Sequence, residues 1–189
     1  MLCLDVLFRS QPLRIPRPVV DRFVPLLPFV STSMARLGAV SGTRANVRRL
    51  LERGELLAIW PEGVGGVARS FRQRYRLQDW RVGHAELAIR HRAPVVPVAI
   101  VGAEEGWPVL ARLRAFHLFG APCLPIPAVL FSLPTHYQIH YGAPISLHRG
   151  LPCDAADDPA VLAQAAARVR GAVRELIHRA LTRRRGVFR

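Results

Sequence analysis

The sequence predicts an α/β fold, in which a partly parallel, mixed sheet is flanked by helices within a single domain. Strand-like apolar segments at residues 55–60 and 95–101 enclose a helical pattern at 82–91, the order typical of a β-α-β unit. A long amphipathic pattern at residues 159–185 predicts a C-terminal helix. The chain has 189 residues, half of them hydrophobic, and this is enough for one substantial core.

The first part of the chain is rich in arginine, proline and bulky apolar residues between residues 9 and 28. This composition fits either an irregular surface or an interfacial element that places Leu26 and similar side chains in lipid. Residues 38–40 follow as a short strand candidate. Thr43 then caps a helix that Gly54 ends.

The segment Trp60-Pro61-Glu62-Gly63 ends the next predicted strand, a short buried one. Pro61 removes a ladder donor, and Gly63 frees the backbone to turn. Glu62 therefore lies at the carboxyl end of a strand, which is the edge where open α/β sheets usually bind ligands. The alternative is an ordinary exit from strand to loop with a solvated carboxylate.

Arginines and aromatic residues are interleaved at residues 69–81, ahead of the helix at 82–91. Pro94 ends that helix, and residues 137–141 alternate like a later strand. Residues 106–153 contain no Asp or Glu. We interpret this stretch as a hydrophobic cover of the core, an apolar wall for an acyl chain, or a loop that dips into a membrane.

The C-terminal pattern favours a helix that docks on the domain over one that lies alone on lipid. Its apolar residues recur at helical spacing, with arginines on the other side. Asp158 favours the start of this helix through its dipole. We expect one domain over residues 1–150, and a linker with the amphipathic helix over 151–189.

Every basic residue in the chain is an arginine, and the formal net charge is +14. Such a charge predicts attraction to phospholipid headgroups, phosphorylated substrates or nucleic acid. The arginines are spread along the whole chain, and no helix-turn-helix, zinc-finger or RNA-binding signature accompanies them. A nucleic-acid partner is therefore the less favoured alternative.

Three isolated cysteines, with no metal-like spacing, indicate a reducing compartment, no disulfide framework and no metal site. Asp5 interrupts the first apolar stretch, so we expect no signal peptide. The longest run without Asp, Glu or Arg, residues 115–147, is broken by five prolines, so we expect no transmembrane helix.

Three segments in this order resemble the glycerolipid (lysophospholipid) acyltransferase family: Gly38 with Arg44, then Trp60 to Gly63, then Val96-Pro97-Val98. Residues 24–36 and the segments YRLQDW and VVPVAIVGAEE resemble its bacterial, diacylglycerol acyltransferase-like branch. The resemblance covers roughly residues 20–147. The second block lacks its usual Phe-Ile-Asp centre, and Val-Gly-Gly replaces the polar half of the third block.

The resemblance implies transfer of a fatty acyl group from coenzyme A or acyl carrier protein to a glycerolipid hydroxyl. It implies no bound cofactor and no metal, because the acyl thioester donor arrives activated. Arg44 would contact the phosphate of a lysophospholipid acceptor, with Arg36, Arg48 and Arg49 as alternatives or as a solvated face. Glu62 would orient the acceptor or brace the site.

Pro61 and Gly63 complete the substrate-binding set that the resemblance implies, because Gly63 lets the backbone come close to the ligand. Pro97 would shape the strand beneath the acyl pocket. The arginines between residues 69 and 76 would partly replace the one that is missing from the third block. The chain would work as a peripheral protein on the cytoplasmic face of a phospholipid membrane.

The family's general base, the histidine of a His-x-x-x-x-Asp block, has no counterpart here, since no His precedes an Asp by five positions. Asp79 with His84, and His148 with Asp154, are poor substitutes. We expect little or no turnover, and a start site or fragment that omits the upstream block. A non-catalytic, membrane-associated relative is the alternative, with a basic nucleic-acid-binding module behind it.

Overall fold

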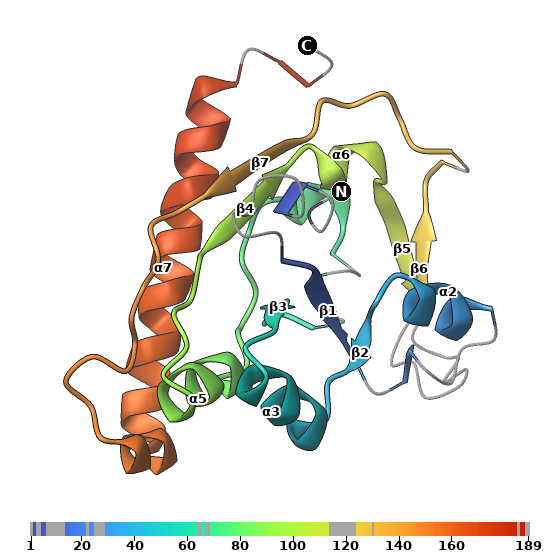
Figure 1. The fold of residues 1–189 in the computed structure, drawn as a ribbon. Coiled ribbons are helices and arrows are strands. Elements are labelled where there is room, and N and C mark those ends of the chain that lie inside the picture. Colours follow the sequence, from blue (N-terminus) through green and yellow to red (C-terminus); the bar gives the residue numbers. More distant parts are fainter. Residues whose placement is uncertain are drawn as a thin grey trace. The chain divides into compact units, whose positions relative to one another are not determined.

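The computed structural model (Figure 1) describes residues 2, 5–6, 14–21, 23–24, 29–63, 66, 69–113, 124–129, 131–184 and 186–187. The chain forms two compact units. Unit 1 comprises Met1–Pro61 and His117–Pro122, and unit 2 comprises Glu62–Phe116 and Cys123–Arg189. The expected lipid contact of Leu26 lies outside the described residues.

Unit 1 contains a three-stranded parallel sheet in the order β2-β1-β3. Its strands are β1 (Pro16–Val20), β2 (Val40–Ser41) and β3 (Leu56–Ala58), and its helices are α2 (Val30–Arg36) and α3 (Arg44–Glu52). The predicted cap of α3 is confirmed, because the Thr43 side chain accepts a hydrogen bond from the Asn46 N–H at 3.3 Å.

Strand β1 corrects the expectation of irregular or interfacial structure at residues 16–20. Pro16 and Pro18 argue against a central strand, because proline cannot donate to a ladder on either side. Residues Pro16–Pro18 pair only with β3, however, and Val19 and Val20 pair only with β2. Each half of β1 therefore has one neighbour, so the prolines are tolerated as they are in an edge strand.

The strand before the Pro-Glu-Gly segment is less buried than expected. The three residues of β3 are half-buried. Ile59 and Trp60 follow the strand and are 38% and 48% exposed. The prediction of a buried strand reaching Trp60 was wrong, because β3 ends two residues earlier and the apolar residues behind it leave the ladder.

Unit 2 is built on an antiparallel pair, β4 (Val98–Val101) with β7 (Gln138–Tyr141). The long helix α7 (Pro159–Arg183) packs along both strands, as Figure 1 shows. Helix α5 (Gly83–Arg90) packs on α7 and on the 3-10 helix η4 (Cys153–Asp157). The predicted segments 95–101, 82–91 and 137–141 are thus confirmed as elements. The predicted β-α-β unit was wrong, because β3 and β4 belong to different sheets, and the parallel pairs are those of β1 with β2 and β3.

Helix α7 docks as the sequence predicts. Asp158 caps its start by accepting a hydrogen bond from the Ala160 N–H at 2.8 Å. One face of the helix is buried, and it comprises Leu162, Ala165, Ala166, Val169, Val173, Leu176 and Ala180. Burying each of the larger side chains stabilises the unit by about 1.5–3 kcal/mol.

A hairpin of β5 (Val109–Leu113) and β6 (Leu124–Pro127) occupies part of the acid-free stretch. These two strands were not among the predicted elements, and Pro125 and Pro127 lie within β6. The short helix α6 (Ala103–Gly106) precedes the hairpin, and the 3-10 helix η2 (Phe71–Gln73) lies in the arginine-rich segment.

Within the described part of the chain, no helix is both long enough and apolar enough to cross a bilayer. Part of the acid-free stretch, residues 114–123 and 130, lies outside the described residues. The expected acyl-chain wall or membrane loop therefore stays a prediction there.

Candidate functional site

The Pro61-Glu62-Gly63 segment forms a turn that follows β3 in the sequence. Gly63 has a φ of 56°, in the left-handed region that a residue without a Cβ adopts at least cost. Gly66 is needed for space, because an added Cβ would lie 2.6 Å from Glu62 Oε2. The glycines therefore let the backbone fold around the carboxylate of Glu62.

Both carboxylate oxygens of Glu62 have protein partners. Oε2 accepts a charge-assisted hydrogen bond from Arg69 Nη2. Oε1 accepts from the Gln78 N–H at 2.8 Å and lies 3.4 Å from Trp80 Nε1. The Glu62 side chain is 13% exposed. In this arrangement Glu62 holds both ends of the segment that runs from residue 69 to residue 80, which we call the brace loop.

Arg69 is buried between two carboxylates. Its side chain is 6% exposed, and its Nη1 donates to Glu104 Oε1 at 2.8 Å while Nη2 meets Glu62. A buried charge with one missing partner is strongly destabilising, whereas a fully paired one is tolerated. Arg69 therefore belongs to the structure of the site, and it is not available to a ligand as the sequence suggested.

Glu104 connects this pair to the middle of the brace loop. Its Oε2 accepts from the Tyr75 N–H at 2.6 Å. Burial raises the pKa of Glu104 above its ordinary value, and the hydrogen bond from Tyr75 and the charge of Arg69 oppose that rise. Tyr75 has a φ of 63°, which is strained for a residue with a side chain.

The hydroxyl of Tyr75 anchors the loop to the end of β4. It accepts a hydrogen bond from the Gly102 N–H at 2.9 Å, and Thr135 Oγ1 donates to the Gly102 carbonyl at 3.1 Å. Burial raises the pKa of Tyr75, so the phenol stays neutral. The left-handed backbone of Tyr75 is thus held from both its N–H and its hydroxyl.

A second buried ion pair lies beside the first. Glu105 and Arg184 form an ion pair through Oε2 and Nη1, and both side chains are 6% exposed. Arg74 Nε lies 3.7 Å from Glu105 Oε1, and the Arg74 guanidinium carbon lies 4.5 Å from the ring centroid of Phe71. These contacts fix the brace loop to the C-terminal end of α7.

The remaining predicted site residue, Arg44, is exposed and opens α3 in unit 1. Among the alternatives to it, Arg48 pairs with Glu52 at 2.7 Å on the same helix. Glu62 belongs to unit 2. The convergence of Arg44 and Glu62 on one ligand therefore stays a prediction.

Pro97 lies just ahead of β4, and its expected place beneath an acyl pocket stays a prediction. It is buried, and its carbonyl accepts a hydrogen bond from the Gly142 N–H at 2.9 Å. A Cβ added at Gly142 would lie 2.8 Å from Pro97 Cγ. Close packing of this pair sets the entry into β4.

His84 does not form the dyad with Asp79 that was considered as a substitute base. Its Nδ1 donates to the Arg81 carbonyl at 2.8 Å, so the other ring nitrogen, Nε2, carries no proton. Nε2 is buried and has no partner among the described residues. Burial lowers the pKa of His84, because a second proton would have no acceptor there.

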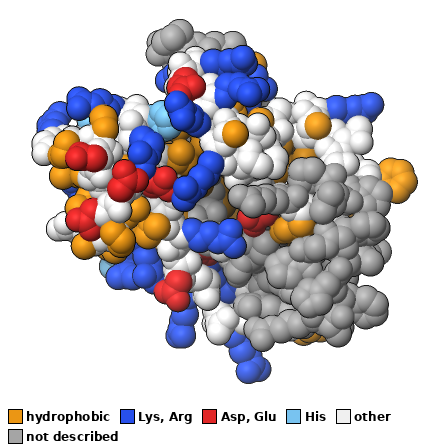
Figure 2. All heavy atoms as spheres, turned by 90° about the horizontal axis from the view of Figure 1, so that it is seen from below, with side chains coloured by type: hydrophobic (Ala, Val, Ile, Leu, Met, Phe, Trp, Pro, Cys, Tyr) orange, Lys and Arg blue, Asp and Glu red, His pale blue; other side chains and the backbone are white. Residues whose placement is uncertain are grey.

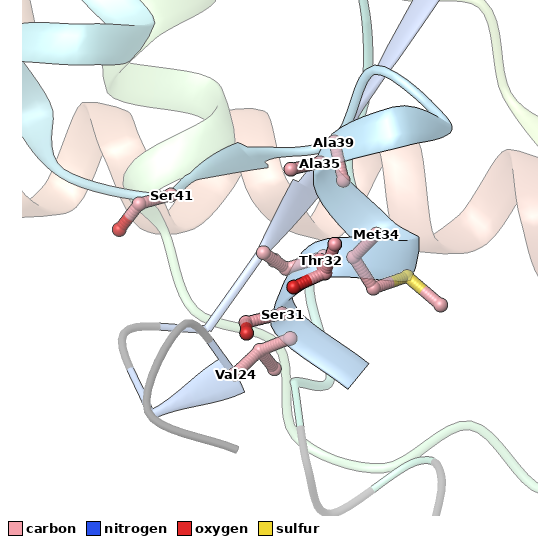
Figure 3. A pocket seen from close by; sticks show the side chains of 8 residues that line it. Val24, Ser31, Thr32, Met34, Ala35, Ala39 and Ser41 are labelled. Carbon is pink, nitrogen blue, oxygen red and sulfur yellow. The ribbon is translucent and has the colours of Figure 1, made fainter. Parts of the chain in front are cut away.

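Unit 1 also contains an open pocket of about 410 Å³ (Figure 3). Helix α2 forms one wall of the pocket. The end of β1 and Val24 after it, and β2 with Ala39 before it, form the rest. The walls comprise Val20, Val24, Ser31, Thr32, Met34, Ala35, Ala39 and Ser41. The volume lies within the range of roughly 300–1,000 Å³ usual for small-molecule sites, and the lining is mainly apolar.

Sequence reasoning found Glu62 but missed Glu104, Tyr75 and the role of Arg69. One signal for these contacts was present in the sequence. Glu104 and Glu105 follow the apolar segment 95–101, whereas the arginine-rich segment 69–81 contains one acidic residue, so the two acids are the natural partners of its arginines. On the face drawn in Figure 2, arginines lie among acidic and apolar side chains.

Residues 1–101 match the family described as Acyltransferase, and the chain belongs to it. This confirms the resemblance. An uncharacterized protein of Mycobacterium tuberculosis (strain ATCC 25618 / H37Rv) is 36% identical over 86% of this chain and 48% of its own length. A protein of Mycobacterium leprae (strain TN) is 36% identical over 86% and 47%.

The "DGAT1/2-independent enzyme synthesizing storage lipids" of Gallus gallus is 30% identical over 67% of this chain and 39% of its own length. The chain spans about half the length of the mycobacterial relatives that it matches. No solved structure matches it.

Proposed function

We propose that the chain serves in the transfer of a fatty acyl group from an acyl thioester to a hydroxyl of a glycerolipid. The donor is coenzyme A or acyl carrier protein, and the acceptor is a lysophospholipid or a similar lipid. The observation that carries the proposal is the Pro61-Glu62-Gly63 turn at the position of the family's third block, because both oxygens of its half-buried carboxylate are hydrogen-bonded. The lipid-synthesizing relative from Gallus gallus supports the same substrate class.

In this proposal Glu62 is a positioning residue. Its oxygens are occupied by Arg69, Gln78 and Trp80, so it acts on the acceptor through the brace loop. Gly63 gives the ligand close access to the backbone, and Pro61 precedes Glu62 in the turn. Arg44 supplies the phosphate contact, for which a guanidinium fork is well suited.

The open pocket of unit 1 is the site that we assign to the acyl chain. Val20, Val24 and Met34 offer apolar contacts, and the small residues Ala35 and Ala39 leave room between them. No metal or cofactor takes part, and the protein works at the cytoplasmic face of a phospholipid membrane.

We propose that the 189 residues alone have little turnover. None of the seven histidines precedes an aspartate by five positions, and His84 is buried with a lowered pKa. A positioned general base contributes typically about 10²–10⁴-fold to such a reaction. The same observation favours a second candidate, a non-catalytic relative that binds the same lipids.

The test is ligand binding to the purified chain, measured by calorimetry with an acyl-CoA and with a short-chain lysophosphatidic acid. Arg44→Met is compared with Arg53→Met, an exposed arginine at the other end of α3. Loss of a charged hydrogen bond, about 1.5–3 kcal/mol, weakens lysophosphatidic acid binding roughly 10- to 100-fold in the first variant. The second variant binds like the wild type.

Transfer of a labelled acyl group, assayed in parallel, stays near background for the chain alone. If the two arginine variants bind lysophosphatidic acid equally, Arg44 does not contact the phosphate as proposed. Failure to bind either ligand, with tight binding of single-stranded DNA at physiological salt, would replace the proposal with the nucleic-acid alternative.

A further inference from the structure

Three large apolar side chains are exposed where the β5–β6 hairpin joins the rest of unit 2. Trp107 is 47% exposed, Leu110 is 74% exposed and Phe131 is 80% exposed. Single exposed apolar residues are ordinary, but a group of them indicates a surface that binds something.

The backbone brings these three residues to one end of the hairpin. The Ala128 N–H donates to the Pro108 carbonyl at 2.8 Å, and the Leu133 N–H donates to the Gly106 carbonyl at 2.9 Å. The two chain segments that enter and leave the hairpin are therefore held side by side. We call this end, with Trp107, Leu110 and Phe131, the hairpin base.

Gly106 fixes the hairpin base further. An added Cβ at this residue would lie 2.7 Å from the Tyr137 hydroxyl and 2.9 Å from Thr135 Oγ1. Close packing of this kind leaves little freedom to the segment that carries Trp107. The exposed apolar group thus sits on a fixed support.

Charge restricts the partner. Residues 106–153 contain no acidic residue, and the formal net charge of the chain is +14. Among the described residues of unit 2, the strands β5 and β6 pair with each other and have no extensive contact with another labelled element. A two-stranded ribbon alone is marginally stable in water, so a partner surface would stabilise it.

We propose that the hairpin base docks on an anionic phospholipid bilayer, with Trp107, Leu110 and Phe131 entering the boundary between headgroups and acyl chains. Aromatic side chains are enriched at that depth, and arginines meet lipid phosphates there. The inference rests on the proposed function, because an acceptor lipid resides in such a membrane. It adds the element by which the protein reaches it.

The experiment is sedimentation with vesicles of equal parts phosphatidylcholine and phosphatidylglycerol. Leu110→Asp and Phe131→Asp are compared with Leu181→Asp, which changes an exposed leucine on α7 in the same unit. Membrane affinity scales with the apolar surface inserted, so each hairpin variant binds about tenfold more weakly or worse. The α7 variant stays within about twofold of the wild type.

Quenching of tryptophan fluorescence by brominated lipid gives a second readout. The wild type is quenched on binding, and Trp107→Phe loses most of that quenching although Trp60 and Trp80 remain. Circular dichroism checks that each variant is folded, and Leu110→Ser and Phe131→Ser replace any aspartate variant that is not.

Equal vesicle binding by the hairpin and α7 variants would overturn the proposal. The proposal would also fail if the wild type self-associates without lipid in sedimentation velocity and Leu110→Asp abolishes that self-association. The hairpin base would then bind a second copy of the chain. Binding of short-chain lysophosphatidic acid, kept below its micelle concentration, tests the proposed function without a membrane. Hairpin variants bind that soluble ligand normally, so either proposal can fail while the other stands.

Discussion

Replacing Arg69 with methionine tests the buried ion-pair network most directly. The change keeps most of the side-chain volume but leaves Glu62 and Glu104 without their shared cation. Breaking a buried pair on one side costs about 3–5 kcal/mol. For a chain of this size we expect a fall in Tm of roughly 6–20 °C.

The matched control is Arg72→Met, which removes an exposed arginine from the same loop. Its free energy of unfolding changes by less than about 0.5 kcal/mol. Urea denaturation followed by circular dichroism measures both variants.

Hydrogen exchange locates the effect. The amides of Gln78 and Tyr75 donate to Glu62 and Glu104, so both exchange faster in Arg69→Met. A loss of stability no larger than that of Arg72→Met, with unchanged protection of these two amides, would refute the role assigned to Arg69.

Three further outcomes are expected. The pKa of Glu104 is raised, so the folded state binds a proton at this carboxylate more tightly than the unfolded state does. The free energy of unfolding therefore falls as pH rises above about 4.5 through the folded pKa. Glu104→Gln flattens this part of the pH profile measured by urea denaturation, and an unchanged slope contradicts the assignment. The pKa of His84 is lowered, so the free energy of unfolding falls as pH drops below about 6.5 toward the folded pKa. His84→Gln reduces that loss in the same urea experiments, and an unchanged loss at acidic pH contradicts the assignment. Gly66→Ala is destabilising because its Cβ meets Glu62, while Gly171→Ala, with open space on α7, stabilises by about 0.5–1 kcal/mol; equal thermal midpoints for the two would disprove this.

Local signals sufficed for the helices. The cap at Thr43 and the spacing of apolar residues in α3 and α7 are properties of neighbouring residues, so the sequence predicts both helices closely. The segment that becomes β1 carries the wrong local signal. Its strand state depends on pairing with residues 40–41 and 56–58, and no local propensity reveals that pairing.

The candidate site divides in the same way. Glu62 is recognisable from Pro61 and Gly63 beside it. Its partners come from residues up to 18 positions away, and Glu104 joins through Arg69 across 35 positions. Tyr75 is harder still to predict, because its left-handed backbone opposes its own preference and is held by tertiary hydrogen bonds.

The pairing of Glu105 with Arg184 spans 79 positions and closes unit 2. During synthesis, β4 and the brace loop leave the ribosome well before α7 can cover them. Completion of unit 2 must therefore wait until residue 184 has left the ribosome, and its apolar strands are meanwhile open to chaperones. Expression at low temperature, or with a chaperone supplied in excess, should accordingly raise the yield of native protein.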